Sequence, residues 1–198
     1  MIALVGESAS GKSSIEKCLV EKYGAEKVIS YTTRPPRSGE TDGVDYHFIS
    51  EEQFAELESE NFFIETAVYR GWHYGTALDD CFDSAKVAVL TPHGLRQIVN
   101  HLHYNVPVYA FYINVPRRDR LIKILQRGDD IEEAYRRSLS DVGQFDGIED
   151  EVDAVLHNPG YQKSVEEMTR ELLIYLIGEE GLQALEHELQ EQAQNMPD

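Results

Sequence analysis

The feature that most constrains the fold is a glycine-framed loop near the start of the chain. Residues 6–14 read Gly-Glu-Ser-Ala-Ser-Gly-Lys-Ser-Ser, which fits the pattern GxxxxGK followed by Ser or Thr. An apolar run, 2–5, precedes the loop, and a segment with helical spacing, 13–23, follows it. The sequence therefore predicts a buried strand, a tight loop and a helix in succession, as in folds where crossover helices join parallel strands.

A loop of this kind binds phosphate because its glycines let successive backbone N–H groups point inward, while the next helix presents its positive end to the anion. We expect Lys12 to reach the β- and γ-phosphates of a nucleoside triphosphate and the Ser13 hydroxyl to ligate Mg²⁺. The alternative is a Gly/Ser-rich turn before an ordinary helix, which the match at every fixed position disfavours. The predicted phosphate-binding residues are Gly6, Glu7, Ser8, Ala9, Ser10, Gly11, Lys12, Ser13 and Ser14.

Length and charge limit the other possibilities. A chain of 198 residues suits one α/β domain with an insertion. Its 18 basic and 36 acidic residues give a net charge of −18, which argues against a nucleic-acid partner. No apolar run approaches the roughly 20 residues of a membrane span, and no leader precedes the first strand, so we expect a cytoplasmic protein without a membrane partner. Cys18 and Cys81 lack the spacing of a disulfide framework or zinc site and are expected to be reduced.

Alternating apolar and helical segments continue along the chain. The predicted core strands are 2–5, about 27–31, 86–91, 107–113 and 153–157. Between them, turn signals divide short aromatic segments over 34–74, which indicates a small inserted subdomain. Ser50 and Gln53 form a capping-box pattern that predicts a helix inside it.

A basic helical segment begins after Pro116 and breaks at Arg127-Gly128, and a second follows through Arg137. This pattern predicts a helix–turn–helix that closes over a nucleotide as a flap; the alternative is two solvated surface helices. A final core helix is predicted over 161–177. Leucines at helical spacing beyond Gly178 predict an amphipathic tail helix that packs on its own domain or on a partner.

Several segments together resemble the acceptor-binding region of guanylate kinases. They read Ser-Tyr-Thr-Thr-Arg-Pro-Pro-Arg-Ser-Gly-Glu at 30–40, Gly-Val-Asp-Tyr-His-Phe at 43–48, Phe-Ile-Glu at 63–65 and His-Tyr-Gly-Thr at 73–76. The resemblance implies an α/β P-loop NTPase three-layer fold with a parallel core sheet, an inserted mixed or antiparallel nucleotide-monophosphate-binding subdomain and a helical lid. It implies one domain, which we divide into a core (1–31 and 77–177), a lid (117–143) within the core, an acceptor-binding insertion (32–76) and an acidic tail helix (178–198).

The same resemblance implies an acceptor site for GMP or dGMP. Its phosphate-binding residues would be Arg34, Arg37, Tyr46 and Tyr74, and its base-reading residues Ser30, Glu65 and Thr76. Two guanidinium forks and two phenols suit a phosphate dianion. Guanine offers two adjacent N–H donors to one carboxylate, whereas adenine presents a lone pair there, so we expect Glu65 to determine specificity.

The sequence departs from the family pattern in the third core strand, in the lid and after Asn158, where Pro159-Gly160 replaces acidic residues. Thr91 stands where the resemblance expects Asp, and we keep it as a base contact because its hydroxyl can still accept one hydrogen bond. Ser138 occupies the likely place of a lid arginine, a role that Arg137 could fill after a one-residue adjustment. Asn158 matches a family residue near the adenine end of the donor.

The activity implied is transfer of the γ-phosphoryl group of ATP to GMP or dGMP with Mg²⁺, by a monomer or homodimer. The predicted catalytic residues are Lys12, Arg34, Arg127 and Arg137. The departures leave two alternatives open: a guanylate-kinase-like domain that binds nucleotide or protein but transfers little phosphate, and a kinase for a different or modified nucleoside monophosphate.

Overall fold

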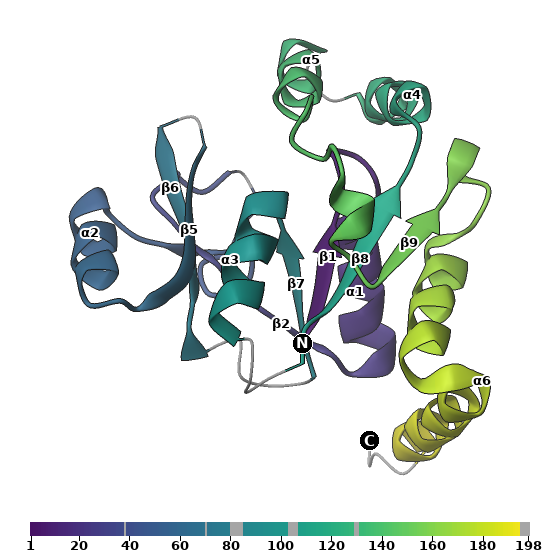
Figure 1. The fold of residues 1–198 in the computed structure, drawn as a ribbon. Helices are drawn as coiled ribbons and strands as arrows, with labels where there is room; N and C mark the ends of the chain where they lie inside the picture. Colours follow the sequence, from purple (N-terminus) through teal and green to yellow (C-terminus); the bar gives the residue numbers. More distant parts are fainter. Residues whose placement is uncertain (38, 70, 80–84, 103–106, 129–130, 195–198) are drawn as a thin grey trace. The chain divides into compact units, whose positions relative to one another are not determined.

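The computed structural model describes residues 1–37, 39–69, 71–79, 85–102, 107–128 and 131–194 (Figure 1). The chain forms two compact units. The first unit comprises Met1–Ala3 and Glu26–Tyr109, and the second unit comprises Leu4–Ala25 and Ala110–Asp198. No helix in the described part of the chain is both long and apolar enough to cross a bilayer.

A five-stranded sheet has the strand order β2-β7-β1-β8-β9. Its strands are β1 (Ile2–Val5), β2 (Glu26–Lys27), β7 (Lys86–Leu90), β8 (Tyr109–Asn114) and β9 (Ala154–His157). In the first unit β2 pairs with β7, and in the second unit β8 pairs with β9, both in parallel. The buried apolar runs of this sheet confirm the predicted α/β fold with a parallel core.

The predicted strand at 27–31 differs from the structure, because the chain changes sheets there. The Val28 N–H still donates to Val87 O at 2.9 Å, whereas the Ser30 carbonyl accepts from His47 N. The strand that starts at Tyr31 belongs to the second sheet. Pairing with distant strands, which a local pattern does not reveal, sets this boundary.

The second sheet lies in the first unit and is mixed, with the order β4-β3-β6-β5. Its strands are β3 (Tyr31–Thr32), β4 (His47–Phe48), β5 (Phe63–Tyr69) and β6 (Trp72–Ala77). Helix α2 (Glu51–Ser59) begins with the predicted capping box, which is confirmed by reciprocal hydrogen bonds between Ser50 and Gln53. Phe54 of this helix is 1% exposed and stacks on Phe63 at 4.6 Å between ring centroids. Helix α3 (Pro92–Leu102) also belongs to this unit.

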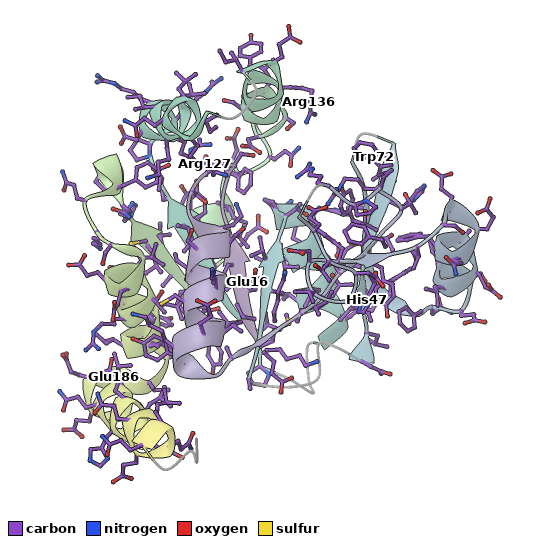
Figure 2. All side chains as sticks on the ribbon, turned by 180° about the vertical axis from the view of Figure 1, so that it is seen from behind. Glu16, His47, Trp72, Arg127, Arg136 and Glu186 are labelled. Carbon is purple, nitrogen blue, oxygen red and sulfur yellow. The ribbon has the colours of Figure 1, made fainter. Side chains whose placement is uncertain are left out.

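The second unit holds the helices α1 (Lys12–Tyr23), α4 (Arg117–Arg127), α5 (Ile131–Ser140) and α6 (Val165–Gln194). Helix α6 is interrupted at Gly178, whose φ of 71° and ψ of 171° are not helical, and it turns there (Figure 1). Beyond the turn Leu182 is fully buried, and Glu186 accepts hydrogen bonds from Tyr23 and Arg170 (Figure 2). The tail therefore packs on its own unit.

Candidate active site

The phosphate-binding loop connects β1 to α1 in the second unit. A Cβ atom on Gly6 would lie 2.7 Å from Ser10 Oγ and 2.8 Å from Ile113 O, so only glycine fits there. Ala9 has a φ of 64°, and Gly11 has a φ of 104° immediately before the helix. These conformations give the loop the tight turn that the sequence predicts.

The loop also has the features that an anion requires. Gly11, at the N-cap position before helix α1, provides no side-chain cap, so the first N–H groups of the helix and its positive end are not satisfied by a side chain. Ser10 Oγ is buried without a hydrogen-bond partner. A cavity of about 560 Å³ adjoins the loop, a size typical of small-molecule sites. It is lined by residues 8–15 together with Lys123, Arg127, Asn158, Tyr161, Lys163, Ser164, Val165 and Met168. A nucleoside triphosphate fits this donor set.

Lys12 folds back over its own loop. Its Nζ donates to Gly6 O at 2.5 Å and to Glu7 O at 2.9 Å. Burial of the ammonium group lowers the pKa of Lys12 to about 8, although the carboxylates of Asp141 and Glu7 oppose the effect. A bound phosphate would supply the counter-charge.

Ser13 is exposed beside the cavity, so its hydroxyl could ligate Mg²⁺. The remaining ligands of the ion would come from the bound phosphates. In the ranges that the structure describes, no group of three His, Cys, Asp or Glu side chains is gathered as a metal site.

Tyr161 contacts the loop although the sequence did not single it out. Its hydroxyl donates to Ala9 O at 2.7 Å, and Lys123 Nζ lies 5.2 Å from the centre of its ring. Tyr161 and Ala9 are 152 positions apart in the sequence, so no local pattern predicts this contact.

In the first unit, the structure brings Arg34, Tyr46 and Tyr74 together. The Arg34 guanidinium is 4% exposed and lies 5.3 Å from the centre of the Tyr46 ring. The rings of Tyr46 and Tyr74 meet edge to face, with 6.0 Å between centroids. Arg37 follows Arg34 closely in the sequence, and its side chain is exposed.

Glu40 organises this turn and was missed by the sequence reasoning. One carboxylate oxygen accepts from Arg34 Nη2 at 2.9 Å, and the other accepts from Arg37 N at 2.7 Å. Burial alone would raise the pKa of Glu40, but these two hydrogen bonds lower it below its usual value. Glu40 thus stays ionised and fixes the guanidinium of the arginine that we expect to bind phosphate.

The predicted base-reading residues also lie together. Glu65 Oε1 accepts from the Thr76 hydroxyl at 2.7 Å, and Ser30 Oγ is 3.4 Å from the same hydroxyl. Burial raises the pKa of Glu65. A Cβ on Gly94 would lie 3.0 Å from Glu65 Oε2, so the glycine allows the carboxylate to approach the backbone closely.

The chain is similar to known proteins over most of its length. The guanylate kinase family model matches residues 1–174. The guanylate kinase of Chlorobaculum tepidum is 33% identical over 160 residues, which cover 75% of this chain and 82% of that protein. The guanylate kinase of Alkalilimnicola ehrlichii is 32% identical over 168 residues, 81% of each protein. The chain belongs to the guanylate kinase family. A crystal structure of guanylate kinase from Anaplasma phagocytophilum has the same fold, with a TM-score of 0.65 at 20% identity over 100% of this chain and 96% of that one.

Within this guanylate kinase family fold, the departure at Thr91 has a structural explanation. Its Oγ1 accepts from Gly94 N at 3.0 Å, so Thr91 caps α3 at the residue before Pro92. The cap uses acceptor capacity that we had reserved for the base. The Thr-Pro pair at a helix start was the signal for this role, and the sequence reasoning overlooked it.

The structure describes the side chain of only one of the two predicted lid arginines, Arg127 and Arg137. Arg127, labelled in Figure 2, is the last residue of α4 and is exposed. It lines the cavity. The backbone of Arg137 lies in α5, but its side chain is outside the described part. Ser138, which stands at the likely place of a lid arginine, is 5% exposed and is therefore packed against protein.

Asn158 lines the cavity but has a local role as well. Its Nδ2 donates to Lys163 O and its Oδ1 accepts from Lys163 N, both at 2.9 Å. These bonds close the turn between β9 and α6. A contact with the donor base remains a prediction.

Proposed function

We propose that this chain transfers the γ-phosphoryl group of ATP to GMP or dGMP, giving ADP and GDP or dGDP. The observation that carries the proposal is the buried Glu65 carboxylate, whose Oε1 is hydrogen-bonded to Thr76 and whose Oε2 lies close to Gly94. An enclosed carboxylate that still has acceptor capacity is costly to the fold unless a ligand with N–H donors uses it.

Guanine has the required donors on adjacent atoms. The ionised Glu65 would accept from N1–H and from the 2-amino group, while the Thr76 hydroxyl holds one carboxylate oxygen in place. Adenine has a lone pair at N1 and would leave a buried carboxylate unpaired, which is the strong form of discrimination by hydrogen bonding. Arg34, Tyr46 and Tyr74 would hold the acceptor phosphate.

On the donor side, the loop amides and Lys12 would cradle the triphosphate, and Arg127 with Arg137 would neutralise charge as the phosphoryl group moves. Bound Mg²⁺, held through Ser13, supplies charge neutralisation at the phosphate oxygens. No covalent intermediate is needed, because positioning and electrostatics account for catalysis of this reaction.

The test is ADP release in a coupled assay with a panel of nucleoside monophosphates. We expect GMP and dGMP to stimulate ADP release and AMP, CMP and UMP to leave it at background. If no guanine nucleotide stimulates the reaction, the proposal fails.

A second candidate is a nucleotide- or protein-binding domain that transfers little phosphate. The capping role of Thr91 favours it, because the hydroxyl expected to contact the base is engaged by Gly94 N, and so does the buried Ser138 at the likely place of a lid arginine. GMP binding in calorimetry without ADP formation would support this candidate. Turnover with a modified monophosphate in place of GMP would instead support a kinase of different acceptor choice, and Glu65→Gln should then leave that turnover unchanged.

A further inference from the structure

A cluster of side chains in the second unit joins the phosphate-binding loop to the segment that carries α4 and α5. The cluster, called here the loop clamp, comprises Glu7, Tyr112, Arg120 and Asp141. We propose that the loop clamp positions the loop for the donor triphosphate, an inference that rests on the proposed function. Its members are positioning residues, since each acts through the loop backbone or through Lys12.

The Glu7 carboxylate is fully engaged. Its Oε1 accepts from Arg120 Nη2 at 2.9 Å, and its Oε2 accepts from the Tyr112 hydroxyl at 3.0 Å. The phenol of Tyr112 is a stable donor, because burial and then the neighbouring Glu7 raise its pKa well above the usual value. Glu7 therefore belongs to the scaffold of the loop, and its side chain is not directed to a ligand.

Arg120 is the centre of the clamp. It is 6% exposed, and besides Glu7 its guanidinium contacts Val115 O at 2.9 Å, Ser8 O at 3.5 Å and Asp141 Oδ2 at 3.7 Å. Arg120 lies in the basic segment after Pro116 that was predicted to form the flap, but these contacts leave it buried and paired. Removing one partner of such a buried pair is costly because the other charge stays without compensation.

Asp141 fixes one peptide of the loop. Its Oδ2 accepts from Ser8 N at 2.8 Å, while the carbonyl of the same peptide, Glu7 O, accepts from Lys12 Nζ at 2.9 Å. The two bonds act on opposite ends of one peptide plane and hold it in a single orientation. Without the Asp141 carboxylate this peptide could rotate. Rotation would turn Glu7 O away from Lys12 Nζ, so Lys12 would lose a contact that holds it beside the cavity.

The clamp also anchors both ends of the α4–α5 segment. Arg120 lies near the start of α4, and Asp141 follows the last residue of α5, Ser140. Arg127, at the far end of α4, lines the same cavity. The anchoring contacts thus relate the loop that would hold the triphosphate to the segment that would supply a cation to it.

The experiment measures binding of Mg-ATP and of GMP separately, by calorimetry, in the full chain and in Asp141→Ala. We expect the ATP dissociation constant to rise about tenfold, as for the loss of a hydrogen bond to a charged group, and the GMP dissociation constant to stay within about twofold. In steady-state assays KM for ATP should rise with little change in KM for GMP, a split that a general loss of stability would not produce. Asp146→Ala is the matched control, because Asp146 is an exposed acid on the same connection.

The outcomes separate the two proposals. Wild-type protein that binds neither nucleotide contradicts the proposed function, whereas normal ATP binding by Asp141→Ala overturns the clamp. Should Asp141→Ala fail to fold in a circular-dichroism melt, Glu7→Gln, Arg120→Met and their combination decide. We expect the combination to weaken ATP binding no more than Arg120→Met alone, since the two side chains act as one unit; fully additive effects overturn the inference.

Discussion

The phosphate-binding loop and the proposed acceptor site, called here the acceptor pocket and comprising Ser30, Arg34, Tyr46, Glu65, Tyr74 and Thr76, are built from different parts of the chain. The loop depends on backbone conformation, with its glycines, its positive φ at Ala9 and an uncapped helix start. The acceptor pocket depends on side chains such as Glu65 and Thr76, which β5 and β6 bring together. A backbone site suits phosphate, which every nucleotide has, whereas a side-chain site can discriminate between bases.

The two sites also differ in which groups hold their functional atoms in place. Around the loop, side chains from distant segments fix the backbone, as Arg120 and Asp141 do for Ser8. Around the acceptor pocket, one functional side chain fixes another, as Glu40 does for Arg34. A substitution at one site should therefore change the binding of that site's ligand and leave binding of the other ligand unaffected.

The largest effect is expected from Lys12→Met. Loss of the only loop ammonium group removes charge stabilisation at the transferred phosphoryl group, so kcat should fall about 10³-fold or more while GMP binding is retained. Steady-state kinetics and GMP calorimetry measure the two quantities. Lys17→Met is the control, since Lys17 is an exposed lysine of the same helix. Equal losses in both variants would contradict a specific role for Lys12.

Glu65→Gln should lower kcat/KM for GMP about 10²-fold, because the amide offers an N–H where guanine needs an acceptor. Glu58→Gln, an exposed position on α2, should have no effect. Affinity for ATP should not change in either variant. A loss of ATP binding in Glu65→Gln would break the proposed separation of the two sites.

The same substitution gives a prediction for stability. Burial raises the pKa of Glu65 above its ordinary value of 4.5. The unfolded chain therefore releases this proton first, and the free energy of unfolding falls as the pH rises from 4.5 through the raised pKa. Gln does not ionise, so Glu65→Gln should melt at the same or a higher temperature than wild type at pH 7, and this advantage should vanish below pH 4.5. A variant that is less stable at pH 7 would contradict this reading of the pocket.

Local signals in the sequence predicted much of the fold and of the loop. The glycine pattern, the Ser50 cap and the apolar strands are each encoded within a few neighbouring residues. The contacts between Arg120 and Glu7 and between Tyr161 and Ala9 join residues separated by 113 and 152 positions, so no local pattern could reveal them. The resemblance supplied the predicted acceptor residues, but it did not indicate that Glu40 would hold Arg34 or that Thr91 would cap a helix.

A smaller effect is expected from Gly94→Ala. The new Cβ would lie 3.0 Å from Glu65 Oε2 and 3.4 Å from Thr91 Oγ1, so the carboxylate must shift by a few tenths of an ångström. KM for GMP should rise roughly fivefold, with KM for ATP unchanged, because a displaced carboxylate aligns less well with guanine. Gly181→Ala is the control, since it adds the same methyl group to α6, outside both sites. An unchanged KM for GMP would show that the pocket adapts without loss.

The smallest effect on activity, and a clear one on stability, is expected from Ser50→Ala. The Ser50 hydroxyl accepts from Gln53 N at 3.2 Å, and the substitution leaves the first turn of α2 without its cap. The free energy of unfolding should fall by about 1 kcal/mol in urea titrations. Both KM values should stay unchanged, because α2 contributes no residue to either site. A rise in KM for GMP in Ser50→Ala would show that the acceptor pocket depends on backbone support, as the phosphate-binding loop does. The two sites would then differ only in how strongly each depends on that support.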